Sequence, residues 1–306
     1  MSPGKAFTDR YLKVMFATLK DATPKEVQEE LERCRSINRK PVRVPKIHRL
    51  HFSEGKFEAS NGFTMQVFST EPWRDPERVT LYLHGGACIY QPVFFHWRFL
   101  HDLALRTHCQ VLTPIYPKHP EYHCVDDVNV LLDYYERAIM PIQAKHVILM
   151  GDSFGGNLAM MMTQEIAKKG WQRPSALVLL SPCVDNAYTR REEMKVLQPL
   201  DQMIKLERVE MLMGSWQGEL PPTHPWVSPI YGDLSSFPDN TLLVYGSHEI
   251  LKVDAELLTE KMNEIGKRIK VLEYLGMFHT FPLFPIKEGF QAIREIASSC
   301  RSNGST

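Results

Sequence analysis

Apolar and polar residues along the chain form two kinds of pattern, one typical of strands and one typical of helices. Residues 46–52 and 63–69 alternate with a period of two and predict strands, with turns at Ser53-Glu54-Gly55 and Asn61-Gly62. Six further short apolar runs predict buried strands, at residues 79–83, 110–116, 147–150, 177–180, 241–245 and 268–274. The pattern therefore predicts an eight-stranded sheet.

Helical patterns fill the intervals between the later strands, over residues 94–106, 125–139, 158–169, 253–266 and 285–299. Because strand and helix alternate from the third strand onward, we expect a mainly parallel sheet with helices on both faces. A chain of 306 residues is long enough to bury a core of this size. The prediction is an α/β fold.

Two stretches fall outside the alternation and predict helical additions. Residues 1–43 are helical in pattern, and Thr23-Pro24-Lys25-Glu26 is a capping box that opens a helix. Residues 186–225 carry Met-rich helical segments and a stretch rich in Pro and Trp, but no β run. We therefore expect a core of residues 44–185 and 226–306, an N-terminal helical segment, and an inserted lid or cap.

A serine stands at the tip of a predicted turn between the strand at 147–150 and the following helix. In Gly151-Asp152-Ser153-Phe154-Gly155-Gly156, glycines two residues before and after Ser153 let the chain bend sharply and expose the hydroxyl. The N-terminus of the helix directs free N–H groups and the positive end of its dipole to the same place. This context favours a nucleophile elbow over a simple Gly/Ser turn.

A nucleophilic serine needs a base that takes its proton and a third group that orients the base. His279 lies after the last predicted strand and before the last helix, where a loop crosses the end of the sheet. The preceding strand leads to two acids, Glu249 and Asp254. Glu249 comes first, whereas Asp254 falls in the first turn of the next helix and should bind that helix's free N–H groups. We predict a triad of Ser153, Glu249 and His279, in that chain order.

Backbone donors would stabilise a negative charge that develops beside Ser153. Such donors must be free of the sheet and directed at the nucleophile. Phe154 follows the serine directly, and His84-Gly85-Gly86-Ala87 follows the third predicted strand. We expect the N–H groups of Gly85, Gly86 and Phe154 to form an oxyanion hole; a plain glycine turn is the alternative at 84–87.

Three motifs together resemble those of one family. His-Gly-Gly-Ala at 84–87, Gly-Asp-Ser-Phe-Gly-Gly at 151–156 and Phe-His at 278–279 are similar to the hormone-sensitive-lipase-like (acetyl-esterase) group of α/β hydrolases. The resemblance spans residues 63–290. The sequence departs from the family where Ala87 replaces the third glycine and where Glu249 stands in place of the usual aspartate.

The resemblance implies an α/β-hydrolase fold in which residues 1–43 and the insert form a helical cap over the acyl site. It implies a serine carboxylesterase that acts on short-acyl esters through an acyl-enzyme, without metal or organic cofactor. An amide or formamide hydrolase on the same triad stays open, as does a non-catalytic small-molecule receptor of this fold, which the intact triad disfavours. Cys88, Phe94, Trp216 and Phe278 are candidate walls of the substrate pocket.

The composition limits which binding partners and which cellular compartment we expect. Lys plus Arg equals Asp plus Glu at 36 each, so no net field attracts nucleic acid or an anionic membrane. The six cysteines lack CxxC spacing, which predicts reduced, mostly buried thiols rather than a zinc site or a disulfide framework. Residues 1–20 are amphipathic but too interrupted for a signal peptide or a membrane span. We expect a cytoplasmic protein that acts on a small-molecule ester without stable membrane insertion; a homodimer and lipid contact by the N-terminal helix stay open.

Overall fold

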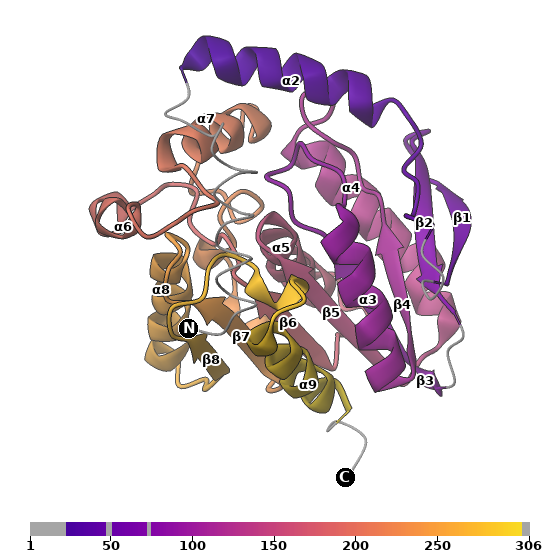
Figure 1. The fold of residues 1–306 in the computed structure, drawn as a ribbon. Helices are drawn as coiled ribbons and strands as arrows, with labels where there is room; N and C mark the ends of the chain where they lie inside the picture. Colours follow the sequence, from indigo (N-terminus) through magenta and orange to yellow (C-terminus); the bar gives the residue numbers. More distant parts are fainter. Residues whose placement is uncertain (1–22, 47–50, 72–74, 302–306) are drawn as a thin grey trace.

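The computed structural model describes residues 23–46, 51–71 and 75–301. Eight strands of this described chain form one sheet, in the order β1-β2-β4-β3-β5-β6-β7-β8 (Figure 1). The strands are β1 (Phe52–Glu58), β2 (Thr64–Thr70), β3 (Asp75–Leu83), β4 (Cys109–Pro114), β5 (His146–Asp152), β6 (Ala176–Leu180), β7 (Thr241–Gly246) and β8 (Lys270–Tyr274). β2 runs antiparallel to both β1 and β4, and every other neighbouring pair is parallel. The predicted mainly parallel sheet is confirmed.

Helices cover both faces of this sheet, as Figure 1 shows. They include α2 (Pro24–Asn38), α3 (Phe94–Thr107), α4 (Cys124–Tyr134), α5 (Phe154–Lys168), α6 (Arg191–Leu197), α7 (Leu206–Trp216), α8 (Lys252–Glu264) and α9 (Lys287–Arg301). α3 and α9 share one apolar cluster with Ile148 and Met150 of β5. α4, α5 and α8 share the other with Val147 and Leu149. The period of two along β5 therefore sends alternate side chains into the two layers.

The first strand differs from the prediction. The sequence predicts a strand over residues 46–52 and a turn at Ser53-Glu54-Gly55, but β1 begins at Phe52 and runs through those turn residues. Residues 47–50 lie outside the described part of the chain. β1 is an edge strand with exposed middle residues, so no apolar alternation marks it, and the hairpin register with β2 sets its position. The Asn61-Gly62 turn joins the two strands as predicted.

The helical additions lie where the sequence predicts helices. A capping box opens α2: Thr23 Oγ1 accepts the Glu26 N–H at 3.3 Å, and Glu26 Oε2 accepts the Thr23 N–H at 2.8 Å. α6 and α7 lie within residues 186–225, and α2 packs against α7 (Figure 1). The amphipathic run of residues 1–20 lies outside the described residues. The division into core and cap stays a prediction.

The burial of the cysteines agrees with the sequence analysis. All six are buried, and none is bonded to another. Burial keeps such thiols unreactive. Among the described residues, no helix combines the length and the apolarity that a membrane span needs.

Candidate active site

Ser153 occupies a sharp turn between β5 and α5. Its backbone angles, φ 53° and ψ −121°, are ones that residues with a side chain rarely adopt. A Cβ on Gly151 would lie 2.1 Å from the carbonyl oxygen of Gly155, and a Cβ on Gly155 would lie 1.9 Å from that of Leu83. The Ser153 N–H donates to Leu180 O at 2.8 Å, which ties the turn to the end of β6. This is the geometry of a nucleophile elbow.

His279 and Glu249 meet at the edge of the sheet that carries Ser153. Glu249 follows β7, His279 follows β8, and the C-terminal ends of these parallel neighbours lie together. Nδ1 of His279 lies 2.5 Å from Oε2 of Glu249. Because a carboxylate only accepts hydrogen bonds, Nδ1 carries a proton, and in the neutral ring Nε2 keeps a free lone pair. The structure thus brings His279 and Glu249 into contact, and their catalytic roles stay a prediction.

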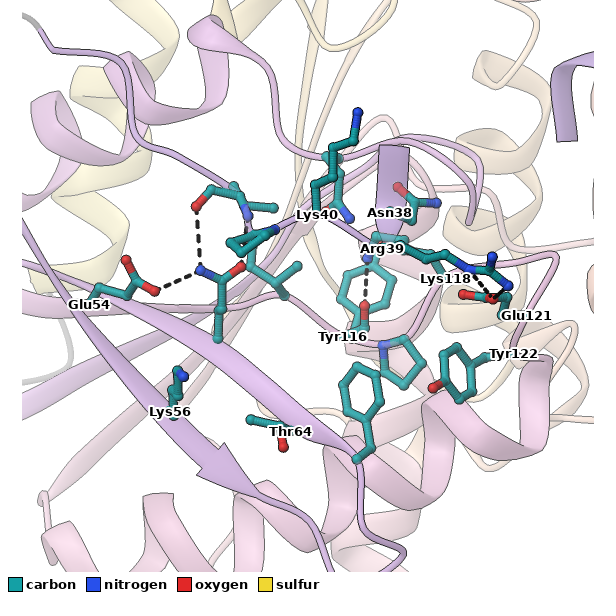
Figure 2. A pocket seen from close by; sticks show the side chains of 17 residues that line it. Asn38, Arg39, Lys40, Glu54, Lys56, Thr64, Tyr116, Lys118, Glu121 and Tyr122 are labelled. Atoms are coloured by element: carbon teal, nitrogen blue, oxygen red, sulfur yellow. Dashed lines mark hydrogen bonds and ion pairs between the residues drawn. The ribbon is translucent and has the colours of Figure 1, made fainter. Parts of the chain in front are cut away.

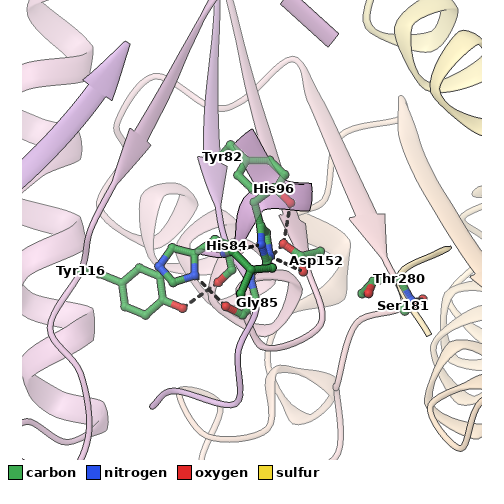
Figure 3. Close-up of polar contacts among 9 residues, drawn as sticks. Tyr82, His84, Gly85, His96, Tyr116, Asp152, Ser181 and Thr280 are labelled. Carbon is green, nitrogen blue, oxygen red and sulfur yellow. Dashed lines mark hydrogen bonds and ion pairs between the residues drawn. The ribbon is translucent and has the colours of Figure 1, made fainter. Parts of the chain in front are cut away.

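The second oxygen of Glu249 is also hydrogen-bonded. Glu249 is fully buried, and its Oε1 accepts from Ser181 Oγ at 2.8 Å and from the Gly246 N–H at 2.7 Å. Ser181 Oγ in turn accepts the Thr280 N–H at 3.1 Å, a contact between two residues that lie together in Figure 3. Buried carboxylates are stable only when donors satisfy them in this way. Ser181 thus ties the loop of the acid to the loop of the histidine.

Neighbouring charges favour the protonated form of His279. Burial by itself would lower the pKa of His279. The charge and hydrogen bond of Glu249 outweigh burial, with help from Asp201 and Asp152, and the pKa lies above its ordinary value. Asp201 belongs to the insert, and its Oδ2 accepts the N–H of Ile250 at 2.8 Å. The insert therefore contacts the loop of the catalytic-acid candidate directly.

Asp254 takes no part in these contacts. The sequence predicts that it binds N–H groups of its own helix, α8. Instead its Oδ2 accepts the Val184 N–H at 2.6 Å and the Asp185 N–H at 3.3 Å, in the loop after β6. These N–H groups lie beyond the last residue of β6, outside the hydrogen bonds of the sheet. Because buried N–H groups need an acceptor, the side chain of Asp254 from α8 satisfies them. The prediction that Asp254 caps α8 is wrong. Burial raises its pKa to about 7.

A buried carboxylate holds the loop after β3 (Figure 3). Asp152 Oδ1 accepts the Gly85 N–H at 2.8 Å and the Tyr82 hydroxyl at 2.5 Å. His96 Nε2 lies 3.3 Å from the other oxygen, Oδ2. Because His96 Nδ1 accepts the Val93 N–H at 3.1 Å, the ring proton is on Nε2 and is donated to Asp152. Burial alone would raise the pKa of Asp152, but His96 and the other donors bring it below its ordinary value.

This contact corrects the expected oxyanion hole. The sequence predicts that Gly85 donates to the oxyanion, but its N–H is already donated to Asp152, and a Cβ on Gly85 would lie 2.3 Å from Asp152 Oδ2. The next two N–H groups, of Gly86 and Ala87, have no acceptor among the described residues. The Phe154 N–H, at the start of α5, is likewise without an acceptor in the described chain. The prediction for Gly85 is therefore wrong, and Ala87 takes its place as a candidate donor.

A tight turn fixes the backbone of these candidate donors. The carbonyl oxygen of Gly86 accepts the N–H groups of Ile89 at 3.1 Å and Tyr90 at 2.9 Å. Gly86 has a φ of 121°, and a Cβ there would lie 2.9 Å from Tyr90 O, so only glycine fits. Ala87 and Cys88 follow with φ values of 46° and 59°. Residues 86–90 therefore form one strained, closely packed turn, the oxyanion turn.

His84 holds the start of this loop. Its Nδ1 lies 2.6 Å from Gly85 O, and because a carbonyl only accepts, the ring donates from Nδ1. The ring stacks on Tyr116 with centroids 4.8 Å apart, and the Tyr116 hydroxyl donates to His84 O at 2.6 Å (Figure 3). Burial, followed by the charge of Lys118, lowers the pKa of His84. A neutral His84 is thus a structural part of the loop.

The sheet, the elbow and the loop after β3 together match a known architecture. A family model described as an alpha/beta hydrolase fold matches residues 80–283, which is more than half of the chain. The chain belongs to the α/β-hydrolase fold family. The fold that the motifs imply is therefore confirmed.

Curated relatives and solved structures show which group of hydrolases this chain is similar to. An esterase of Acinetobacter venetianus is 30% identical over 229 residues, which cover 74% of this chain and 75% of the relative. An acetyl-hydrolase of Streptomyces hygroscopicus is 30% identical over 238 residues, which cover 74% and 76%. A mutant of the esterase E40 has a TM-score of 0.82 at 25% identity, with 99% of each chain covered. An esterase from the bacterial hormone-sensitive lipase family has a TM-score of 0.75 at 25% identity, with 92% of this chain and 99% of that one covered. The hydrolase thus belongs with the hormone-sensitive-lipase-like esterases.

Three of the four candidate pocket walls of the hydrolase are buried in its core. Cys88 and Trp216 have no solvent exposure, and Phe278 has 2%. Trp216 packs edge-on against Phe154 with ring centroids 4.8 Å apart, and Phe278 lies in the apolar cluster of α3 and α9. Burying these side chains stabilises the core. Their role as pocket walls stays a prediction, as does that of Phe94, which is 40% exposed.

A cavity of about 350 Å³ lies away from this site, beside the C-terminal end of α2 (Figure 2). Asn38, Tyr116 and Lys118 are among its walls, together with residues of β1 and β2, whereas Ser153 and His279 do not line it. It is therefore separate from the chemistry around the elbow. Elsewhere in the described chain, no group of three or more His, Cys, Asp or Glu side chains is placed to hold a metal ion.

Three side chains that support the site have no role in the sequence analysis. Asp152 stands inside the elbow motif and Ser181 in a Ser-Pro segment after β6, so their positions next to a motif and a strand end could have indicated them. Asp201 lies 49 residues before Ile250, whose N–H it accepts. No local pattern connects these two positions; only the fold brings them together.

Proposed function

We propose that this hydrolase is a serine carboxylester hydrolase whose catalytic triad is Ser153, His279 and Glu249. The observation that carries the proposal is the 2.5 Å contact between His279 Nδ1 and Glu249 Oε2, at the edge of the sheet where the elbow presents Ser153. Relatives named esterase and acetyl-hydrolase support ester hydrolysis.

The hydrogen bond to Glu249 leaves Nε2 of His279 as the basic atom. Nε2 takes the hydroxyl proton of Ser153 while Oγ attacks the ester carbonyl carbon. The buried carboxylate of Glu249 stabilises the positive ring that forms. The ring then gives its proton to the leaving alcohol, and the C–O bond to that alcohol breaks, which leaves the acyl group on Ser153. Water attacks this acyl-enzyme with His279 as base, and the carboxylic acid leaves with Ser153 restored.

Backbone donors hold the negative oxygen of each tetrahedral intermediate. The N–H groups of Gly86 and Ala87 follow β3, and that of Phe154 follows β5, which is the parallel neighbour of β3. The start of α5 adds the positive end of the helix dipole. Each donor of this kind typically contributes about 10²- to 10³-fold in rate.

The preferred substrates are esters with short acyl groups, roughly C2 to C6, because the apolar side chains nearest the elbow fill the core instead of lining a long channel. Trp216 packs directly on Phe154 and has no exposure. The acetyl-hydrolase of Streptomyces hygroscopicus supports this preference. A series of p-nitrophenyl esters tests it: kcat/KM should fall beyond the short acyl groups, and a rise out to long chains contradicts it. A p-nitroanilide of the same acyl group separates esterase from amidase activity.

The triad is tested by Ser153→Ala together with labelling by an organophosphonate. We expect the wild type to hydrolyse p-nitrophenyl butyrate and to be labelled at Ser153 in a one-to-one ratio. Ser153→Ala should keep its thermal midpoint and lose about 10⁴- to 10⁶-fold in kcat. Labelling at another residue, or turnover that survives in Ser153→Ala, contradicts the proposal.

A further inference from the structure

Helix α2 contacts the oxyanion turn at two points. Asn38, the last residue of α2, donates from Nδ2 to Ile89 O at 2.8 Å. Two helical turns earlier, Glu30 accepts a hydrogen bond from the Tyr90 hydroxyl. Ile89 and Tyr90 are the residues whose N–H groups close the turn on Gly86 O. A helix remote in sequence from Ser153 therefore holds one end of the oxyanion turn.

The Glu30 contact is buried and fixed from several directions. Glu30 is only 5% exposed, although it is an acid on the outermost helix. It pairs with Arg208 of α7, and Arg33 Nη2 lies 3.3 Å from its Oε1. Two cations that hold one carboxylate fix the acceptor for the Tyr90 hydroxyl. The link thus joins α2, α7 and the oxyanion turn.

The C-terminal end of α2 is fixed as well. Arg39, directly after Asn38, donates to Glu121 Oε1 from Nε at 2.8 Å and from Nη2 at 2.5 Å. Figure 2 shows Asn38, Arg39 and Glu121 around the cavity at this end of the helix. The contact of Asn38 with Ile89 therefore lies beside an ion pair that links the end of α2 to Glu121.

The core holds the rest of the same loop. The His119 N–H donates to Cys88 O at 3.1 Å, and the Tyr116 hydroxyl donates to His84 O at 2.6 Å. Residues 84 and 88 are thus held from the core, whereas Ile89 and Tyr90 are held from α2. Removing the α2 contacts should loosen the turn without unfolding the loop.

We propose that α2 positions the oxyanion hole: Asn38 and the Glu30–Tyr90 pair hold residues 86–90 so that the N–H groups of Gly86 and Ala87 stay directed at the oxyanion. This inference rests on the proposed function, because it assigns the free N–H groups to an oxyanion bonded to Ser153. Donors stabilise a transition state only when they are held in place beforehand, and a displacement of about 1 Å can cost up to roughly 100-fold in rate. Asn38, Glu30 and Tyr90 are positioning residues and touch no substrate.

The test uses two variants of the full-length protein that remove one contact each. Tyr90→Phe removes the hydroxyl and keeps the ring, and Asn38→Ala removes the amide. Glu32→Gln is the matched control on α2, because Glu32 is exposed and its described contacts are with Gln28 and Arg35 of the same helix. We would measure kcat and KM for p-nitrophenyl butyrate and the inhibition constants of an alkyl trifluoromethyl ketone and its methyl ketone analogue. The first ketone adds Ser153 Oγ and forms an oxyanion, whereas the second binds as an uncharged ketone.

We expect kcat to fall about tenfold in each variant with KM nearly unchanged, less than the loss of a donor outright. The inhibition constant of the trifluoromethyl ketone should rise by the same factor as kcat falls, while that of the methyl ketone stays constant. The pH at half-maximal turnover should not move, because His279 and Glu249 are untouched. Glu32→Gln should behave as the wild type.

Two outcomes overturn the inference. One is that both variants keep the wild-type kcat; the other is that both ketones weaken equally, which indicates a general loosening of the site. If one variant fails to fold, the other decides. Failure of the proposed function looks different, because then the wild type is not labelled at Ser153 or Ser153→Ala keeps its turnover.

Discussion

On one side of Ser153 lies the loop of residues 84–90, and on the other side lie the loops that carry Glu249 and His279. The first offers backbone N–H groups, and a buried carboxylate, Asp152, holds it through Gly85, Tyr82 and His96. The second offers ionisable side chains joined by a 2.5 Å contact. The first side therefore depends on where its N–H groups are placed, and the second depends on the charges of its side chains.

The difference predicts where the pH dependence of turnover arises. Asp152 has a pKa below its ordinary value, so the loop it holds does not change charge near neutral pH. His279 has a raised pKa and must lose its proton before it can act as a base. Turnover should therefore fall with falling pH through the titration of His279.

The largest expected effect comes from removing the negative charge of Glu249, which pairs with His279. Glu249→Gln should keep the fold and lose up to about 10⁴-fold in kcat, because an amide no longer fixes the proton on His279 Nδ1. Steady-state kinetics on p-nitrophenyl butyrate measure this loss. Asp254→Asn is the control, since Asp254 binds the loop of residues 184–185 and not the histidine. An inactive Asp254→Asn beside an active Glu249→Gln would reverse the assignment.

The pairing of Glu249 with His279 could be predicted because consecutive parallel strands place their C-terminal loops side by side. The sheet could be predicted for a similar reason. β5 and β6 are buried on both faces, so they appear in the sequence as continuous apolar runs. β1 could not, because an exposed edge strand carries polar residues along its middle.

The errors at the site have a common physical cause. The N–H of Gly85 is taken by Asp152, which is 67 residues away, and Asp201 reaches Ile250 across 49 residues. A motif shows which backbone is free of the sheet but not which side chain then binds it. Local patterns cannot report such contacts.

The second-largest expected effect follows from a change at Asp152, which holds the loop of residues 84–90. In Asp152→Asn the amide oxygen can accept from both Gly85 and Tyr82, but the NH₂ group then faces the Nε2–H of His96, which the Val93 N–H keeps in that tautomer. Two donors facing each other in a buried site should cost about 2 kcal/mol in the free energy of unfolding. Loosening of the oxyanion turn should lower kcat by roughly 10- to 100-fold with little change in KM. Urea unfolding and steady-state kinetics measure the two effects.

The same variant tests how the negative charge of Asp152 affects the free energy of unfolding at different pH values. Because the folded pKa of Asp152 is depressed, its ionised form stabilises the fold above its unfolded pKa of about 3.9, and this stabilisation is lost as the pH falls through the folded pKa. The difference in unfolding free energy between wild type and Asp152→Asn should therefore shrink below about pH 4. A difference that grows as the pH falls below about 4 contradicts this account.

A smaller effect concerns the charge of Asp201 beside His279. Asp201 raises the pKa of His279 together with Glu249 and Asp152. Asp201→Asn should lower that pKa, so the acid limb of kcat/KM should move to lower pH from a starting point above the ordinary value of about 6.5. At a pH well above that limb, where His279 is neutral, turnover should change little. Glu193→Gln, an exposed acid on α6 of the same insert, should leave the limb in place. An unshifted limb in Asp201→Asn contradicts the electrostatic role.

The smallest expected effect on turnover concerns Asp254, which contacts neither His279 nor the loop of residues 84–90 and so should change stability alone. Burial raises its pKa to about 7, and the two N–H groups of residues 184 and 185 do not offset that burial. Since the folded state binds this proton more tightly than the unfolded state, stability falls as the pH rises between the unfolded and the folded pKa. An asparagine keeps an oxygen for the same N–H groups and has no proton to lose. The free energy of unfolding of Asp254→Asn relative to wild type should therefore rise by up to about 1.4 kcal/mol per pH unit between pH 5 and 7, then level off. Urea titrations at several pH values measure this slope, and a difference that is the same at every pH would show that Asp254 does not gain its proton on folding.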